Sequence, residues 1–399
     1  MVDAISHDNH PPSRPVKEGM RYLITFFLLV LHVALGGAQQ ASTDVHGTWT
    51  AEIHTGKVYL QVRTAPPSDW TRSGNWNNDW NMGQSLPIEE LQGLANSDTF
   101  TMAAVKFDLR REAGSMAFEG SFRDGRGAGL FTFAPRAGYV AEMKALGYAE
   151  ELPLWRRFQL AVHDVGPKYI RDLKSEGYDT LTLDQIQRAK THGVTIDYIR
   201  EIKGQGFKAA TLEELVRTRD HGVTGDFVKT MKAEGFPGPT LEEFVRLRDH
   251  GVTQPFIRDM KKAGFTGATV EDLVRARDHG VKPEYVEEIR RLGLGVTGLE
   301  QFVRLRDHGV TVDYVKALES QGFKNLPVED IVKTKDHGVS AEFVADMREI
   351  GLKDATLPQL FRLRDHGITP GFVNHARARG YQTTDPDELV RLKNGGLWK

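Results

Sequence analysis

Hydrophobic positions over the last two thirds of the chain recur with the spacing of short amphipathic helices. In residues 221–249, Phe227, Val228 and Met231 form one apolar set. A second set begins at Leu241 and has the i, i+3, i+4 spacing of one helix face. The segment therefore predicts two short helices, each with one face turned toward a core.

Each of these two helices has a start signal and a stop signal. Thr224 and Thr240 stand where N-caps are expected, and Glu243 follows Thr240 at the spacing of a capping box. Gly235 and Gly251 end the helices, because glycine accepts the left-handed conformation needed there. Helices this short are marginal alone, so the pair must be stabilised by stacking on its neighbours.

The pair recurs in register with a period of 29 residues. Histidines keep this step from His163 onward, and glycines keep it from Gly177. The later histidines are His192, His221, His250, His279, His308, His337 and His366, and the glycines that end first helices include Gly206, Gly235 and Gly264. A fixed period of this kind indicates a repeat architecture, and we expect an α-solenoid of about nine helix pairs over residues 137–399.

Several cap positions, four of them in three of the later repeats, carry a residue other than threonine. Gly298, Pro327 and Asp385 replace the second threonine, and Lys282 replaces the first. Since proline and lysine are poor N-caps, we expect the repeats with Lys282 and Pro327 to be looser than the others.

Before the repeats, over residues 43–135, the hydrophobic period changes to two. Trp49, Ala51 and Ile53 alternate with polar neighbours, and Asp124-Gly125 is a hairpin signal between two later runs. We expect a small antiparallel β domain of five or six strands, with a short helix near residues 86–94. The predicted class is mainly α, and α+β overall.

The N-terminus carries an apolar run that is too short for a comfortable membrane span, Tyr22–Leu35. Arg21 precedes the run and small residues ending at Ala38 follow it, which predicts a signal peptide over residues 1–38 and a periplasmic or secreted protein. Two interpretations of residues 1–19 stay open. Either translation begins at Met20 and not at Met1, or these residues form a long cytoplasmic n-region of the signal peptide. An uncleaved signal anchor is the alternative, and the only expected contact with a membrane.

Composition removes several classes of function. Lys and Arg total 52 against 54 Asp and Glu, so no global charge favours nucleic acid. The absence of cysteine excludes disulfides, Cys-bound zinc, iron–sulfur clusters and thiol catalysis. The sequence has no H-E-x-x-H, G-x-S-x-G, Walker A or EF-hand pattern. We therefore expect no enzyme and no cofactor.

The histidine series has two interpretations. Each histidine ends a helix beside glycine, where an imidazole can donate to the last carbonyls. Alternatively, histidines of neighbouring repeats share a metal ion, but two nitrogens fall short of the three or four ligands that zinc takes. We expect these histidines to be structural caps, without metal.

Two charged series accompany the histidines. Arg217 stands four residues after Glu213, the spacing of a helical ion pair, and the same spacing relates Arg246 to Glu242, Arg275 to Glu271 and Arg304 to Glu300. This favours solvated, locally paired faces over a groove for a polyanion. An aspartate such as Asp220 precedes most of the histidines and opposes the dipole of its helix, so we expect an arginine of the adjacent repeat as its partner.

A tryptophan-rich segment supplies the best candidate ligand patch. Trp70, Trp76 and Trp80 lie among Asn and Asp residues, a combination that can stack on sugars or anchor a peptide. Packing within the β domain is the alternative.

The repeats read DHGVT followed by FV or YI and then GF or GY, and they resemble the "HGVT" helical repeats of some bacterial envelope proteins. Similar repeats follow membrane metallopeptidases of the beta-lactam sensor-transducer type. Gly47-Thr48-Trp49 and residues 118–133 resemble the module that joins peptidase and repeats there. The peptidase helices and their zinc motif are missing here, so no catalytic role carries over. The resemblance implies an exported module that works with such a peptidase.

Together these patterns predict an exported, non-enzymatic interaction scaffold or sensing module of the bacterial envelope. It would bind a protein or peptide partner through its helical repeats. The alternative is a cell-wall or glycan-binding module that uses residues 70–80.

Overall fold

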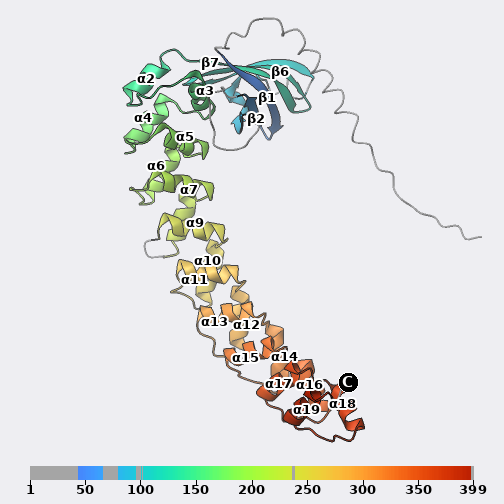
Figure 1. Ribbon diagram of the computed structural model, residues 1–399. Helices are drawn as coiled ribbons and strands as arrows, with labels where there is room; N and C mark the ends of the chain where they lie inside the picture. The colour runs from blue at the N-terminus through green and yellow to red at the C-terminus, as the bar shows by residue number, and fades with distance from the viewer. Residues whose placement is uncertain (1–43, 66–79, 96–99, 101, 236–238, 397–399) are drawn as a thin grey trace, which may run out of the picture. The chain divides into compact units, whose positions relative to one another are not determined.

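The computed structural model describes residues 44–65, 80–95, 100, 102–235 and 239–396. The chain divides into two compact units, Met1–Gly166 and Pro167–Lys399. The described part of the first unit is a β-sheet followed by two helices, and that of the second unit is helical (Figure 1).

Seven strands of the first unit form one antiparallel sheet in the order β3-β2-β1-β7-β6-β5-β4. They are β1 (Val45–His54), β2 (Lys57–Thr64), β3 (Trp80–Pro87), β4 (Leu91–Gln92), β5 (Ala103–Arg111), β6 (Gly114–Arg123) and β7 (Arg126–Pro135). Thr55-Gly56 and Asp124-Gly125 have positive φ at both residues, as a two-residue hairpin between twisted strands requires. The predicted antiparallel β domain and its hairpin signal are thus confirmed.

The sheet differs from the expectation in two details. It has seven described strands rather than five or six, because β3 and the two-residue β4 lack a strong alternation of apolar and polar residues. The helix expected near residues 86–94 is one 3₁₀ turn, Ile88–Glu90, which connects β3 to β4.

The sheet and the first helix pair, α2 (Tyr139–Ala145) and α3 (Leu154–Val162), share one core. Trp49 is 1% exposed at its centre, with Phe107 at 5.2 Å between ring centroids. Phe158 of α3 stacks on Phe131 of β7 at 5.7 Å. Burial of these aromatic side chains is the main driving force for the association of α3 with the sheet.

The second unit consists, in its described part, of helices of eight or nine residues. They are α4 (Pro167–Ser175), α5 (Leu183–Thr191), α6 (Ile196–Gly204), α7 (Leu212–Asp220), α8 (Gly225–Lys232), α9 (Leu241–Asp249), α10 (Gln254–Lys262), α11 (Val270–Asp278), α12 (Pro283–Arg291), α13 (Leu299–Asp307), α14 (Val312–Ser320), α15 (Val328–Asp336), α16 (Ala341–Glu349), α17 (Leu357–Asp365), α18 (Pro370–Ala378) and α19 (Pro386–Asn394). With α2 and α3 they make nine pairs among the described residues, as predicted.

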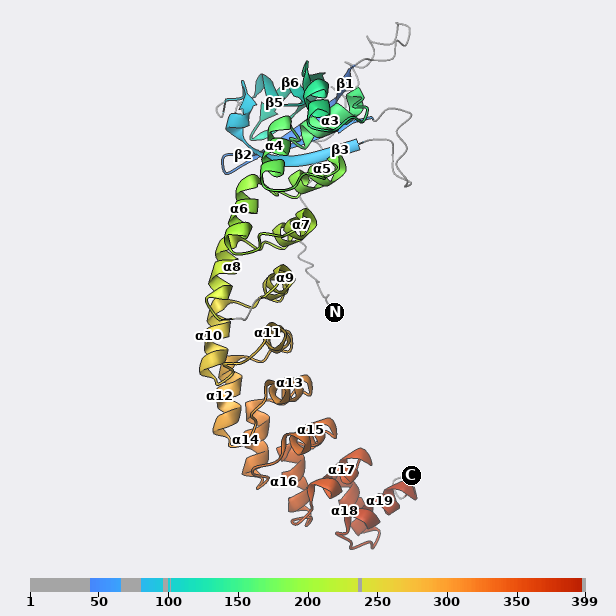
Figure 2. The same cartoon turned by 90° about the vertical axis from the view of Figure 1, so that its left-hand side faces the viewer.

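These helices stack in two columns. Contacts run between helices two places apart, such as α5 with α7 and α6 with α8. Figure 2 shows α6, α8, α10 and α12 following one another on one side and α7, α9, α11 and α13 on the other. We call the even-numbered helices α4 to α18 the first-helix column and the odd-numbered helices α5 to α19 the second-helix column.

The predicted caps are present at most helix starts. Thr224 accepts a hydrogen bond from the Phe227 N–H at 3.2 Å, and Thr240 and Glu243 form a capping box. Lys282 and Pro327 provide no side-chain cap, as their residue types predict.

Within the described ranges, the structure has no helix of the length and apolar character needed to span a bilayer. The apolar run Tyr22–Leu35 lies outside those ranges.

Candidate functional site

From His192 onward, each histidine that ends a second helix reaches the next repeat. The Nδ1 atom of His192 lies 2.7 Å from Oδ1 of Asp220, which ends the following second helix. The same contact recurs at His221–Asp249, His250–Asp278, His279–Asp307, His308–Asp336 and His337–Asp365, while His366 faces Asn394. The aspartates therefore have histidine partners rather than the expected arginines.

The backbone itself closes the helix that each histidine ends. After His192, the N–H of Gly193 donates to the Lys190 carbonyl and the N–H of Val194 to the Ala189 carbonyl. This is the Schellman pattern, which satisfies the last carbonyls without a side chain. The imidazole, expected to donate to those carbonyls, instead contacts the neighbouring repeat. Where Gly206, Gly235 and Gly264 end first helices, their φ angles are 100°, 82° and 97°.

Arginine and glutamate form a second set of contacts between repeats. Arg217 donates from both Nε and Nη2 to the carboxylate of Glu242, at 2.5 and 2.7 Å. The equivalent pairs are Arg188–Glu213, Arg246–Glu271, Arg275–Glu300, Arg304–Glu329 and Arg362–Asp387. The partners are 25 residues apart, in adjacent repeats, and not four residues apart within one helix as expected. The hydrogen bond from Arg217 holds the pKa of Glu242 below its ordinary value.

The second basic series packs on aromatic rings. The guanidinium of Arg219 lies over the ring of Tyr198, 5.0 Å from its centroid, and joins α7 to α6. Equivalent contacts are Arg248–Phe227, Arg277–Phe256, Arg306–Tyr285, Lys335–Tyr314, Arg364–Phe343 and Lys393–Phe372. These cation–π contacts stabilise each pair from within.

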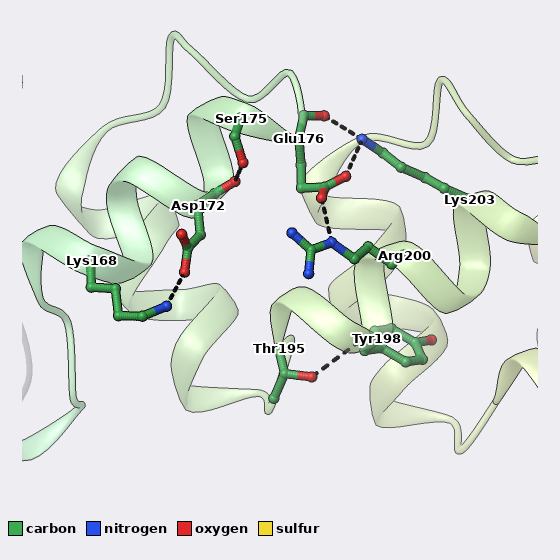
Figure 3. Close-up of polar contacts among 8 residues, drawn as sticks. All are labelled: Lys168, Asp172, Ser175, Glu176, Thr195, Tyr198, Arg200 and Lys203. Atoms are coloured by element: carbon green, nitrogen blue, oxygen red, sulfur yellow. Dashed lines mark hydrogen bonds and ion pairs between the residues drawn. The ribbon is translucent and has the colours of Figure 1, made fainter.

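At the ends of several first helices, basic side chains of the next repeat form a network that the sequence did not predict. The close-up in Figure 3 shows Arg200 and Lys203 of α6 converging on Glu176, which follows α4. Arg200 Nε donates to the Glu176 carboxylate at 2.7 Å, and Lys203 Nζ donates to the Glu176 carbonyl. The hydrogen bond from Arg200 is the main cause that holds the pKa of Glu176 below its ordinary value. A cation at the negative end of a helix dipole is favourable as well.

Two repeats further on, Glu234 repeats this arrangement in a more buried form. Glu234 is 8% exposed and accepts hydrogen bonds from Gln254 at 2.8 Å and from Arg258 at 3.0 Å. Burial alone would raise the pKa of Glu234, but these hydrogen bonds and the charges of Arg258 and Lys261 outweigh it, so the pKa is lowered.

The contact between α15 and α17 departs from the arginine–carboxylate pattern of the other second helices. Pro358 stands where the other repeats place the acidic partner, 25 residues after Lys333. In the same interface Phe361 replaces the usual valine, and its ring stacks on His337 at 4.7 Å. An aromatic contact thus takes the place of an ion pair.

The tryptophan patch is only partly described. Trp80 lies in β3, half-buried, with its ring 5.7 Å from Trp155 and 5.3 Å from Phe158. Trp70 and Trp76 lie outside the described residues. The visible contacts of Trp80 are therefore packing contacts in the core of the first unit.

A metal site at the histidines would need several ligating side chains close together. Among the residues that the structure describes, no three His, Asp or Glu side chains come together as a metal site would need. The prediction of a metal-free protein stays a prediction.

The two columns differ in how much their exposed residues vary. At one exposed position of the second helix, successive repeats carry Arg217, Arg246, Arg275, Arg304, Lys333, Arg362 and Arg391. At an exposed position of the first helix they carry Arg200, Lys229, Arg258, Glu287, Lys316, Ala345 and Asn374. Alignment of the repeats by their 29-residue period would have revealed this contrast from sequence.

Comparison with known proteins adds no function to this geometry. No family model matches the chain, and no curated protein matches it either. The resemblance to the HGVT repeats therefore stays a prediction.

Proposed function

We propose that this protein is an exported, non-enzymatic interaction scaffold of the bacterial envelope that binds a protein or peptide through the first-helix column. The observation that carries the proposal is the difference between the two columns. The second-helix column presents the same bonded side chains in nearly every repeat, whereas the first-helix column presents side chains that differ from repeat to repeat.

The second-helix column uses its exposed polar groups to hold the repeats together. Arg217 and Glu242 remain about half exposed, at 50% and 51% of their side-chain surface, yet they are bonded to each other. The pair His221–Asp249 occupies the same face. A partner that recruited these groups would have to replace contacts between repeats, so this column is poorly suited to specific binding.

The first-helix column has exposed positions that the stacking fixes in only some repeats. Arg200 and Arg258 bind Glu176 and Glu234 of the preceding repeat, whereas the equivalent residues of other repeats differ in chemistry. Position by position they change from basic, as in Lys229, to acidic, as in Glu287, and to small, as in Ala345. Side chains that differ from repeat to repeat give each place along the surface its own chemistry. Extended solenoid surfaces bind protein partners in this way, with a few residues contributed by each repeat.

Export and the kind of partner rest on the sequence. The apolar run Tyr22–Leu35 and the absence of cysteine are compatible with a secreted protein that needs no disulfides. The resemblance to repeats that follow membrane metallopeptidases makes such a peptidase a candidate partner.

Capture from envelope extracts tests the proposal. The chain without its signal segment is used as bait beside two shortened forms, one that begins at Pro167 and one that ends at His337. Capture should survive removal of the first unit and weaken when the last repeats are removed, since the binding surface runs along the repeats. Far-UV circular dichroism of each form checks that the helices persist.

The opposite pattern would contradict the proposal. If capture is lost with the first unit while helicity persists, binding belongs to the β domain, and the glycan-binding alternative with the tryptophan segment becomes the better explanation.

A further inference from the structure

The first-helix column is electrically polarised from α4 to α16. Helices α4, α6, α8 and α10 carry ten Lys and Arg against five Asp and Glu, a net charge of +5. Helices α12, α14 and α16 carry four against eight, a net charge of −4, and the last helix of the column, α18, carries one arginine and no Asp or Glu. We call these two stretches the basic half and the acidic half.

The second-helix column has no such polarity. Each of its helices from α5 to α19 has a net charge between −1 and +1. Its arginines face glutamates of the next repeat, as in Arg217–Glu242, so charge is balanced locally. The polarity is therefore a property of one surface and not of the repeat sequence in general.

Contacts within the stack leave most of this polarity in place. Glu176 and Glu234 pair with Arg200 and Arg258, and counting these two carboxylates reduces the basic half from +5 to +3. Lys232 donates to the Gln205 carbonyl, which bears no formal charge, so its own charge persists. A basic half and an acidic half remain on one surface.

We infer that the first-helix column of one chain docks antiparallel on the first-helix column of a second copy. In a two-fold dimer the same surface is used on both chains, so the basic half of each meets the acidic half of the other. A parallel arrangement would place like charges together. The inference rests on the proposed function, because it takes the column as a protein-binding surface and names the partner.

A second copy is the occupant that the charge pattern fits best. A polyanion would be repelled by the acidic half, and a cationic peptide by the basic half. The charge pattern complementary to this surface is its own pattern in the opposite direction. A second copy presents that pattern when it lies antiparallel. A second copy and any other protein would exclude each other there.

Most of these charges are exposed, so the dimer should depend strongly on salt. The Debye length falls from about 10 Å at 0.1 M to about 3 Å at 1 M ionic strength. Exposed complementary charges act mainly on orientation and association rate, and screening removes their contribution.

Two charge-reversal variants of the chain without its signal segment test the inference. The first replaces exposed residues of the acidic half, Glu288→Lys, Glu342→Lys and Glu349→Lys. The second replaces exposed residues of the basic half, Arg171→Glu, Lys229→Glu and Lys262→Glu. The matched control is Lys333→Glu, on the second-helix column. Mass is measured by analytical ultracentrifugation at about 0.05 M and about 0.5 M salt.

The unmodified chain and the control should dimerise at low salt and dissociate as salt rises. Each variant alone should dimerise at least tenfold more weakly, because its reversed half meets a half of like charge. An equimolar mixture should form dimers again, since both contacts then join opposite charges. A single chain with all six substitutions should also dimerise with itself, which keeps the test decisive if one variant folds poorly.

An unmodified chain that stays monomeric at low salt would overturn the inference. So would variants that dimerise as well as the unmodified chain, or a mixture and six-substitution chain that stay monomeric. A monomeric chain that still captures an envelope protein would refute self-association and leave the proposed function standing.

Discussion

Individual side chains in this protein are placed by the stack more than by their own helix. The imidazole of His250 contacts Asp278 at 2.7 Å, although Gly251 and Val252 already satisfy the helix end. The imidazole and the carboxylate are both partly exposed, so one such contact contributes no more than about 1 kcal/mol. Stability at this scale comes from repetition, not from one strong interaction.

Two glycines two residues apart provide a test of the left-handed helix end. Gly206 has a φ of 100°, whereas Gly204 is the last residue of α6 and has open space around it. Gly206→Ala should destabilise by about 1–2 kcal/mol, because an L side chain is strained in this conformation. Gly204→Ala should stabilise by about 0.5–1 kcal/mol. Urea denaturation checks both, and equal effects would contradict the cap assignment.

The buried carboxylate of Glu234 predicts a dependence on pH. Its pKa is lowered in the folded state, so its contribution is complete above the ordinary carboxyl pKa and is lost as pH falls through the folded value. Glu234→Gln should cost about 1–3 kcal/mol at pH 7. Between pH 7 and pH 3 the variant should lose less free energy of unfolding than the unmodified chain. An identical pH dependence in the two proteins would show that Glu234 is not ionised in the fold.

At the scale of helices and strands, local signals were predictable and distant partners were not. The starts at Thr224 and Thr240 and the ends at glycine depend on a few neighbouring residues, so the sequence alone identified them. The strand β3 was missed because its apolar residues do not alternate.

At the candidate site, too, the residues were predictable from sequence but their partners were not. The His, Asp and Arg series were visible as periodic residues, but their partners depend on how one repeat lies on the next. Glu242 was expected to pair with Arg246 in its own helix and pairs with Arg217 of the preceding repeat. Local spacing is a weak guide when a neighbouring helix offers a closer partner.

A double-mutant cycle on His250 and Asp278 measures the contact between α9 and α11. Each single change to alanine should destabilise by about 0.5–1 kcal/mol, and the coupling energy should be about 0.5 kcal/mol. The same cycle on His250 and Asp249, adjacent in sequence, is the control and should give no coupling. A larger coupling within the helix than between helices would contradict the assignment of the His–Asp contacts to neighbouring repeats.

At the scale of the whole molecule, the repeats should behave as a sum of neighbour contacts. A chain that ends at His337 loses α16 to α19 but keeps every contact among the earlier repeats. It should stay helical with a melting temperature a few degrees lower. The new end uncovers Ile331 and Val332, which are 1% exposed in the full chain, so solubility should fall more than helicity. Global unfolding on truncation would show that the repeats do not act as nearest neighbours.

We propose the first-helix column as the recognition surface of this protein. The most direct test compares capture of envelope proteins by the chain with Glu288→Lys, Glu342→Lys and Glu349→Lys and by a chain with Lys333→Glu. The first variant should lose at least tenfold in captured partner, while the second should capture as much as the unmodified chain. Unchanged capture by the first variant together with a loss in the second would place recognition on the second-helix column and contradict the claim.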